Sequence, residues 1–334
     1  MKQKIKRQVE PIMIDKYGRN IDYLRISLTD RCNLRCIYCM PEEGVKSLSH
    51  AEILTYDEIL RICRCGAELG IRKIKLTGGE PLVRKGCASL AGQIKAIPGI
   101  EKVTLTTNGI LLEEQLDDLL KAGIDAINIS LDTLDREKYQ EITGTDACET
   151  VRQAVAAAAE SGIRTKVNTV LQSDGDKTEW KALITLAESL PVDVRFIELM
   201  PIGYGKENTG VSNLELLDEI RKVYPDIRKD SKIHGNGPAV YYQIPGFTGG
   251  IGFISAMHGK FCKNCNRIRL TSTGDLKPCL CYGDTYPLKD LLRNGTEEEI
   301  RKQIKRAIEQ KPAAHCFEEP GAITEAHQMA QIGG

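Results

Sequence analysis

Apolar positions in the first two thirds of the chain switch repeatedly between two periods. Short runs rich in β-branched residues predict six strands, at residues 23–28, 73–76, 102–106, 126–131, 165–171 and 193–198. Between them, apolar residues recur every three or four positions and predict helices at residues 56–69, 86–96, 111–122, 148–161 and 177–189. This alternation is typical of a parallel sheet covered by helices. Six such units are fewer than the eight of a closed barrel, so we expect an α/β fold, an incomplete (β/α)6 barrel that is open on one side.

The pattern changes after the sixth predicted strand. A helix is predicted at residues 212–224, followed by a polar, glycine-rich stretch, a pair of strands around 239–256 and helices near 288–309. We therefore expect two domains: a partial barrel over residues 14–230, and a smaller C-terminal α+β domain over residues 231–334 that packs against the open barrel.

Charge and composition narrow the possible partners. Of the 334 residues, 46 are Lys or Arg and 46 are Asp or Glu, so no overall field favours nucleic acid or a membrane surface. No run approaches 18 apolar residues, and the basic start, residues 1–7, leads into no apolar signal segment. We therefore expect a cytoplasmic protein whose 12 cysteines are not paired in disulfides.

Three of these cysteines lie in one short segment directly after the first predicted strand. Cys32, Cys36 and Cys39 have the spacing C-x3-C-x2-C. Three thiolates can bind three irons of a [4Fe–4S] cluster, which needs four ligands, so one iron stays open to another molecule. The alternative is a structural zinc site or a set of buried thiols. Zinc commonly needs four protein ligands, and no further cysteine or histidine is closer than His50.

A second group of three cysteines lies near the C-terminal end of the chain. Cys262, Cys265 and Cys279 have the spacing C-x2-C-x13-C. Three thiolates again predict a cluster with one open iron, in the C-terminal domain. The alternative is a zinc site completed by His258 or Cys281.

Two arginines follow this second group at alternating positions. On a strand, Arg267 and Arg269 point to the same face. Two guanidinium groups beside a cluster form a pocket for an anion, and their planar forks suit a triphosphate. In the alternative interpretation, either arginine lies on a solvated face or pairs with acidic neighbours.

Functional groups in parallel α/β folds gather at the carboxyl ends of the strands, and the remaining motifs follow this rule. Gly78-Gly79-Glu80-Pro81 follows the second predicted strand, and its glycines let the backbone approach a ligand closely. Together with the first cysteine group, this GGEP turn resembles the radical S-adenosylmethionine (SAM) enzymes, in which SAM occupies the open iron. The resemblance implies a TIM-like partial barrel of the radical SAM type, with SAM contacts from Tyr38, Gly79, Ser130 and Met200.

Nearly the whole chain, from about Gly18 onward, resembles one family of these enzymes closely. The run Phe-Cys-x2-Cys-Asn-Arg-x-Arg at residues 261–269 and the final Gly333-Gly334 are similar to the GTP 3′,8-cyclases of molybdenum cofactor biosynthesis. The resemblance implies two [4Fe–4S] clusters, the first generating a radical from SAM and the second leaving an iron open to the guanine of GTP. It assigns the binding of GTP to Arg25, Lys75, Thr106, Lys166, Arg267, Ile268 and Arg269.

Two of these assignments carry alternatives. Lys75 stands where the family often has arginine, so it keeps the charge but not the bidentate fork. The resemblance also gives Arg267, Arg269, Gly333 and Gly334 a part in catalysis. A glycine tail can thread into a narrow site because it has no side chains, whereas the alternative is ordinary disorder of a terminus.

The reaction implied by the resemblance converts GTP to (8S)-3′,8-cyclo-7,8-dihydroguanosine 5′-triphosphate. Its implied partners are GTP, SAM, an external low-potential electron donor and a downstream protein that forms the cyclic pyranopterin. The sequence leaves a homodimer open. Two other functions fit part of the pattern. One is a radical SAM enzyme that modifies peptides or proteins, which usually carries more cysteines around its auxiliary cluster. The other is a non-catalytic iron–sulfur electron carrier, which needs four ligands per cluster.

Overall fold

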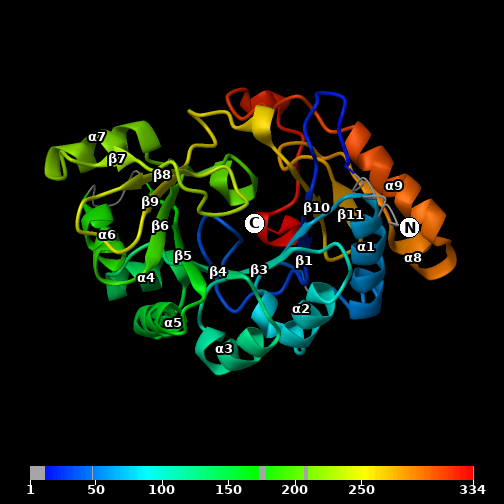
Figure 1. Ribbon diagram of the computed structural model, residues 1–334, viewed down its shortest axis with the longest axis horizontal. Helices are drawn as coiled ribbons and strands as arrows, with labels where there is room; N and C mark the ends of the chain where they lie inside the picture. Colours follow the sequence, from blue (N-terminus) through cyan, green and yellow to red (C-terminus); the bar gives the residue numbers. More distant parts are fainter. Residues whose placement is uncertain (1–11, 47, 173–177, 207–209, 334) are drawn as a thin grey trace, which may run out of the picture.

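Six parallel strands form the wall of a partial barrel, with helices on its outer side (Figure 1). The computed structural model describes residues 12–46, 48–172, 178–206 and 210–333. The six strands are β1 (Tyr23–Ser27), β2 (Lys73–Thr77), β3 (Lys102–Thr107), β4 (Ala126–Ser130), β5 (Arg164–Thr169) and β6 (Val192–Ile197). Each pairs in parallel with the next one along the chain. The predicted α/β class with six strand–helix units is therefore confirmed.

Helices connect these strands and cover the outer face of the barrel. They are α1 (Tyr56–Leu69), α2 (Cys87–Lys95), α3 (Leu112–Lys121), α4 (Arg136–Thr143), α5 (Cys148–Glu160) and α6 (Glu179–Ser189), with a short 3-10 helix, η1 (Pro81–Val83). The ends of α1 follow the local rules. Thr55 forms a reciprocal capping box with Glu58, and Gly70 ends the helix in the left-handed conformation at φ 108°.

The C-terminal part of the chain adds strands to both edges of the same sheet. Next to β6 lie β9 (Ile251–Ile254), β8 (Val240–Gln243) and β7 (Arg228–Lys229), and next to β1 lie β10 (Arg267–Leu270), β11 (Asp275–Lys277) and β12 (Tyr286–Pro287). β9 and β10 run parallel to the barrel strands, and the outer strands pair antiparallel. The predicted strand pair around 239–256 is the β8–β9 pair. The division at residues 230 and 231 stays a prediction; the sheet is continuous there, because β7 pairs with β8.

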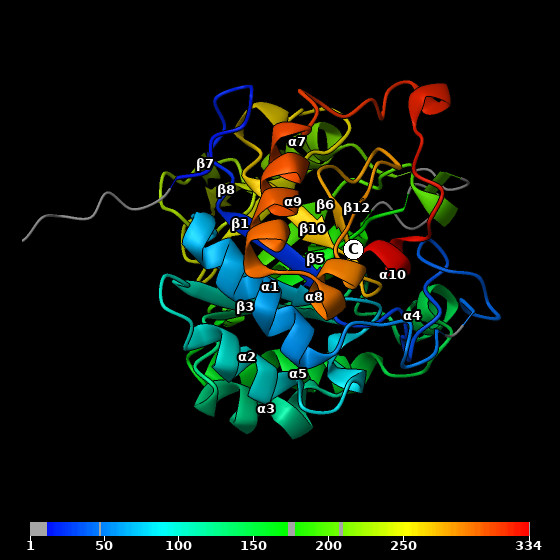
Figure 2. The ribbon, with the colours of Figure 1, turned by 90° about the vertical axis from the view of Figure 1, so that its right-hand side faces the viewer.

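Two C-terminal helices pack against the outside of α1 (Figure 2). The helices after the barrel are α7 (Asn213–Val223), α8 (Lys289–Asn294), α9 (Glu297–Glu309) and α10 (Met329–Ile332), with η2 (Gly203–Lys206), η3 (Cys262–Asn264) and η4 (Pro320–Ala322). At the contact of α8 and α9 with α1, Arg61 pairs with Glu297 at 2.7 Å and donates to the carbonyl groups of Leu292 and Gly295. These bonds fix the C-terminal part to the barrel wall.

The end of the chain returns to the middle of the barrel (Figure 1). A small hydrophobic cluster supports it, with the buried members Ile202, Leu280, Cys281, Phe317, Ile323 and Ile332. Ile332 belongs to α10 and is 1% exposed. Gly333 lies against Ser27 and Thr77, the last residues of β1 and β2. The described chain end therefore lies at the carboxyl ends of the strands, where the functional groups are expected.

Among the described residues, none of the helices combines the length and the apolar character that crossing a membrane would require.

Candidate active site

A cavity of about 490 Å³ runs through the barrel between the two ends of its strands. Cys32, Cys36 and Cys39 line it at the carboxyl end. Lys102 and Arg164, the first residues of β3 and β5, line it toward the amino end. Its volume lies in the range of small-molecule sites.

The first cysteine triad, Cys32, Cys36 and Cys39, lies on the loop after β1. Tyr38 ties this loop to the neighbouring wall, because its hydroxyl donates to Asp132 at 2.6 Å, just beyond β4. Burial raises the pKa of Cys39 to about 12, and the nearby Cys32 and Asp132 add to the effect. These thiols therefore favour the neutral form on their own, and a cation such as iron must stabilise the thiolates. Three thiolates on one loop at the edge of a cavity fit a [4Fe–4S] cluster with one iron open to a ligand.

The glycine turn after β2 packs directly against this loop. A Cβ at Gly79 would lie 2.4 Å from the carbonyl oxygen of Arg31, the residue before Cys32. The amide of Gly79 donates to Thr29 at 2.7 Å, and that of Glu80 donates to Arg31 at 2.8 Å. Only glycine allows so close an approach, so the GGEP turn and the cysteine loop form one unit.

Glu80 extends this unit to the end of β3. Its carboxylate accepts hydrogen bonds from the Thr107 hydroxyl at 2.7 Å and from the Asn108 amide at 2.6 Å. Burial raises the pKa of Glu80 to about 7, although these hydrogen bonds oppose the rise. The side chain of Asn108 donates to Asn33 at 2.7 Å, back on the cysteine loop. The loops after three neighbouring strands are therefore held together by buried polar bonds.

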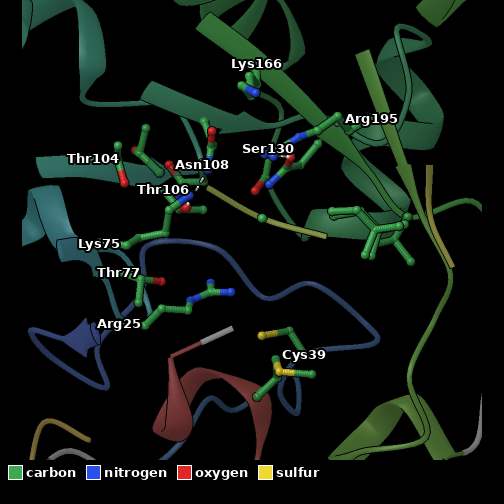
Figure 3. A pocket seen from close by; sticks show the side chains of 18 of the residues that line it. Arg25, Cys39, Lys75, Thr77, Thr104, Thr106, Asn108, Ser130, Lys166 and Arg195 are labelled. Carbon is green, nitrogen blue, oxygen red and sulfur yellow. Dashed lines mark hydrogen bonds between the residues drawn. The ribbon is translucent and has the colours of Figure 1, made fainter. Parts of the chain in front are cut away.

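Cationic side chains from several strands converge on the same cavity (Figure 3). Arg25, Lys75, Lys166 and Arg267, which the sequence predicted, line it from β1, β2, β5 and β10. Arg195 on β6 also lines it and was not predicted. Burial lowers the pKa of Lys75 well below its usual value, and the charges of Arg25 and Arg195 add to the effect. Cations that repel one another in this way create a strong field for a polyanion.

Lys166 illustrates how the protein itself holds these cations. Its ammonium donates to the carbonyl of His234 and to the Tyr241 hydroxyl at 2.9 Å, and it lies 3.5 Å from Asp193. Burial lowers its pKa to about 7, and the charge of Arg195 contributes. His234 and the residues up to 238 line the amino end of the cavity, so this segment forms its floor.

The other predicted ligand contacts fall into two groups. Thr106, Ser130 and Met200 line the cavity together with Tyr38 and Gly79. Ile268 instead packs in the hydrophobic core with 1% exposure, which leaves only its backbone for a ligand.

Residues that precede the two terminal glycines also line the cavity, which the sequence did not predict. Met329 and Ala330 of α10 line the cavity. Arg269 is buried and donates to the carbonyl of Gly333. Gly334 lies outside the described residues. Arg269 and Gly333, which the sequence assigned to catalysis separately, are therefore in contact with each other.

The second cysteine triad lies on the loops beside β10 and β11. Cys262 begins η3, Cys265 follows it, and Cys279 comes after β11. Burial acts to raise the pKa of Cys265, but the charges of Arg267 and Lys311 outweigh it and the pKa falls to about 6. This thiol is therefore mainly ionised at neutral pH, which is the form that binds iron. The donor set fits a second cluster.

Both candidates for a fourth zinc ligand at this triad have other partners. The sulfur of Cys281 lies 3.2 Å from that of Cys316, and Nδ1 of His258 lies 3.0 Å from the Glu198 carboxylate. In the described part of the chain, no three His, Cys, Asp or Glu side chains are grouped closely enough to hold a single metal ion. A cubane cluster binds each thiolate through a different iron, so its three cysteines need not lie close enough together to hold a single ion.

The sequence matches two families over most of its length: the Radical SAM superfamily at residues 26–187 and Molybdenum Cofactor Synthesis C at residues 192–317. The GTP 3′,8-cyclase of Clostridium perfringens (strain SM101 / Type A) is 46% identical over 323 residues, which are 96% of this chain and 100% of that protein. The chain belongs to the GTP 3′,8-cyclase family. Another GTP 3′,8-cyclase, from Desulforamulus reducens, is 42% identical over 96% of this chain and 100% of its own length. Molybdenum cofactor biosynthesis protein 1 of Drosophila melanogaster is 42% identical over 92% of this chain, but over 55% of its own length.

Solved structures of more distant proteins share the fold of this GTP 3′,8-cyclase family member. Streptococcus suis SuiB bound to S-adenosylmethionine has a TM-score of 0.65 at 15% identity, over 95% of this chain and 79% of that one. A His-tagged anSMEcpe with bound AdoMet has a TM-score of 0.59 at 17% identity, over 85% and 80% of the two chains. At these identities the likeness concerns the fold alone. The two family matches meet near residue 190, at the start of β6.

Proposed function

We propose that this chain converts GTP to (8S)-3′,8-cyclo-7,8-dihydroguanosine 5′-triphosphate in molybdenum cofactor biosynthesis. The observation that carries the proposal is the cavity, which joins the first cysteine triad at one end to Lys75, Lys166 and Arg195 further along. The reaction needs a radical source and a triphosphate site in one enclosed space, because the ribose carbon must be positioned and water must be kept away. Full-length relatives bear the name of this activity.

In this proposal each triad holds one [4Fe–4S] cluster. The first triad would leave an iron open to SAM, and the SAM would meet Tyr38, Gly79, Ser130 and Met200 on the cavity wall. When bound, this cluster and SAM supply the 5′-deoxyadenosyl radical that takes the 3′ hydrogen from the ribose of GTP. The second triad, on the loops beside β10, would place an open iron near the guanine.

The protein's own part is to bind, orient and enclose. Arg25, Lys75, Lys166 and Arg195 would hold the triphosphate through charge-assisted hydrogen bonds, and Thr106 would add a neutral contact. Arg267 reaches the same cavity from β10, between the triphosphate site and the second triad.

The chain end would act on the radical step. Arg269 holds the carbonyl of Gly333, and Met329 and Ala330 close the wall next to the first triad. A glycine end can lie this deep because it adds no side chain. We assign Arg267, Arg269, Gly333 and Gly334 to catalysis on this basis.

The test is anaerobic incubation of the reconstituted protein with GTP, SAM and dithionite, followed by mass analysis. The expected products are the cyclised nucleotide and 5′-deoxyadenosine in matching amounts. The matched control is the full chain with Cys32, Cys36 and Cys39 replaced by Ala, which should give neither. Cleavage of SAM that leaves GTP intact would contradict the proposal and would favour a radical SAM enzyme that modifies peptides. The electron donor, the downstream pterin-forming protein and a homodimer remain part of the proposal.

A further inference from the structure

Lys311 is a buried cation beside the second cysteine triad. It lies two residues after the end of α9 and is 2% exposed. It is not among the residues that line the substrate cavity, in contrast to Arg267. A phosphate group bound in the cavity would therefore meet Arg267 before it met Lys311.

The partners of Lys311 do not neutralise it. Its ammonium donates to the carbonyl of Pro278 at 2.7 Å, next to Cys279. Within the described ranges, no carboxylate lies at ion-pair distance from it. A buried charge without a counter-charge is destabilising. Because Pro278 directly precedes Cys279, this hydrogen bond holds the ammonium beside the triad.

The segment that carries Lys311 is fixed around the triad. Arg19 donates to the carbonyl groups of Cys262 and Ala313 at 3.0 Å, and also to that of Pro312. The amide of His315 donates to the sulfur of Cys262 at 3.4 Å. Lys311 is thus held in place by the same bonds that hold the cysteine loop.

Arg19 provides a contrast within this arrangement. It is also buried beside the triad, but its charge is neutralised by Asp15 at 2.6 Å. Unlike Arg19, Lys311 has no carboxylate at ion-pair distance among the described residues.

We propose that Lys311 is the fixed counter-ion of the second iron–sulfur site. Three thiolates outweigh the positive charge of the cluster core, so the site is anionic and gains a further negative charge on reduction. A nearby cation stabilises the reduced form more than the oxidised form, because the reduced form carries one more negative charge. Burial strengthens this effect, because less solvent screens the cation. Lys311 therefore makes the second cluster easier to reduce and favours its assembly. The inference rests on the second cluster of the proposed function and adds the residue that sets its charge balance.

The test compares three variants in the full chain with Cys32, Cys36 and Cys39 replaced by Ala, so that only the second cluster is present. Lys311→Met removes the buried charge, and Lys311→Arg keeps it. Lys263→Met is the matched control, because Lys263 lies in η3 between Cys262 and Cys265 but is exposed and screened by solvent. After anaerobic reconstitution, iron content and an electron-paramagnetic-resonance redox titration are measured.

We expect Lys311→Met to shift the reduction equilibrium toward the oxidised cluster by about tenfold, which is 59 mV for one electron. Lys311→Arg should stay close to the parent protein, and Lys263→Met should shift the equilibrium much less than Lys311→Met. If Lys311→Met fails to retain iron, the Lys311→Arg variant provides the test. Iron content and a reduction potential equal to those of the parent protein would then support the role of the positive charge.

Three outcomes would overturn the inference. These are an unchanged potential in Lys311→Met at full iron content, an equal shift in Lys263→Met, and a Lys311→Arg variant that behaves like Lys311→Met. An unmodified chain that assembles only one cluster would also remove the basis of the inference, but that failure would lie with the proposed function.

Discussion

The two cysteine triads carry the same number of thiols but differ in their charged neighbours. Burial raises the pKa of Cys39 in the first triad to about 12, and the carboxylate of Asp132 adds to the effect. In the second triad, Arg267 and Lys311 lower the pKa of Cys265 to about 6 against the effect of burial. The difference matches the ligands that we propose: SAM is a sulfonium cation, whereas GTP is a polyanion. In the proposed function, spacing supplies the thiols of each site, and their charged neighbours distinguish the ligands.

The sharpest way to break this comparison is to remove each triad separately. Alanine at positions 32, 36 and 39 should abolish both SAM cleavage and cyclisation, since the radical source is lost. Alanine at positions 262, 265 and 279 should leave some uncoupled SAM cleavage but no cyclised product. Each variant should lose about half of the iron if both triads hold a four-iron cluster. Anaerobic iron analysis and product quantification provide the measurement.

Cys281→Ala is the control for the second triad, because Cys281 faces Cys316 instead of the triad. It should leave iron content and turnover nearly unchanged. Zinc without iron at the second triad, or normal cyclisation without Cys265, would contradict the division of roles.

The cations that line the cavity predict a large effect on the affinity for GTP but not on the affinity for SAM. Lys166→Ala should weaken GTP binding by roughly 10- to 150-fold, because charge-assisted hydrogen bonds contribute roughly 1.5–3 kcal/mol each. Arg195→Ala should have an effect of the same order, since Arg195 lines the same cavity. SAM affinity should change little in either variant. Equilibrium binding to the reconstituted protein tests this, and unchanged GTP affinity in both variants would rule out the triphosphate site.

The chain end contacts elements of both sites and predicts an intermediate effect. Ala330 lines the same cavity as Cys39, and Arg269 holds Gly333. Removing Gly333 and Gly334 should lower the product formed per SAM cleaved by roughly tenfold, the scale of one hydrogen bond to a charged group. GTP affinity and iron content should be unaffected.

Arg269→Gln provides the matched variant for this contact. Because it removes the partner of Gly333, combining it with the truncation should cost less than the two effects added together. Full additivity, or a truncated chain with the normal product ratio, would show that the chain end has no part in the reaction.

The smallest expected effect is the uptake of a proton when GTP binds. The pKa of Lys166 is lowered from 10.5 to about 7 in the free protein, so much of its charge is lost as the pH rises through 7. A bound triphosphate favours the charged form and raises this pKa again. GTP binding near pH 8 should therefore take up as much as about one proton, and the affinity should fall with increasing pH.

Calorimetry in two buffers of different ionisation enthalpy measures this proton. Lys166→Met is the control, because it should abolish the uptake. Equal uptake in the variant would assign the proton to another group.

Local pattern was enough to predict much of the fold, and the assignment of the cysteines as cluster ligands stays a prediction. The six barrel strands and their helices follow from apolar period and from glycine stops such as Gly70. α4 was not predicted, because its residues are mostly polar and few of them are buried. The edge strands β7 and β12 have two residues each, too few to show a period.

The parts of the site that were not predicted depend on long-range packing. Arg195 is an ordinary residue in its own strand, and only its register beside Asn168 of β5 places it in the cavity. Nothing in the sequence around Lys311 indicates that its side chain is buried beside Cys279. Met329 and Ala330 reach the cavity because the small cluster around Ile332 supports α10, and the members of that cluster come from four separate parts of the chain.

The loop that carries Cys262 and Cys265 also has a consequence for the order of assembly. It runs from β9 on one edge of the barrel to β10 on the other (Figure 1). Until this part of the chain has been synthesised, β1 and β6 are both unpaired edges, which are templates for aggregation. The first triad can form from local residues, whereas the second must wait for pairings between distant parts of the chain, such as Tyr23 with Arg267. The strands β9 and β10, which this loop joins, thus cover the two edges, and Cys279, which follows β11, completes the second triad.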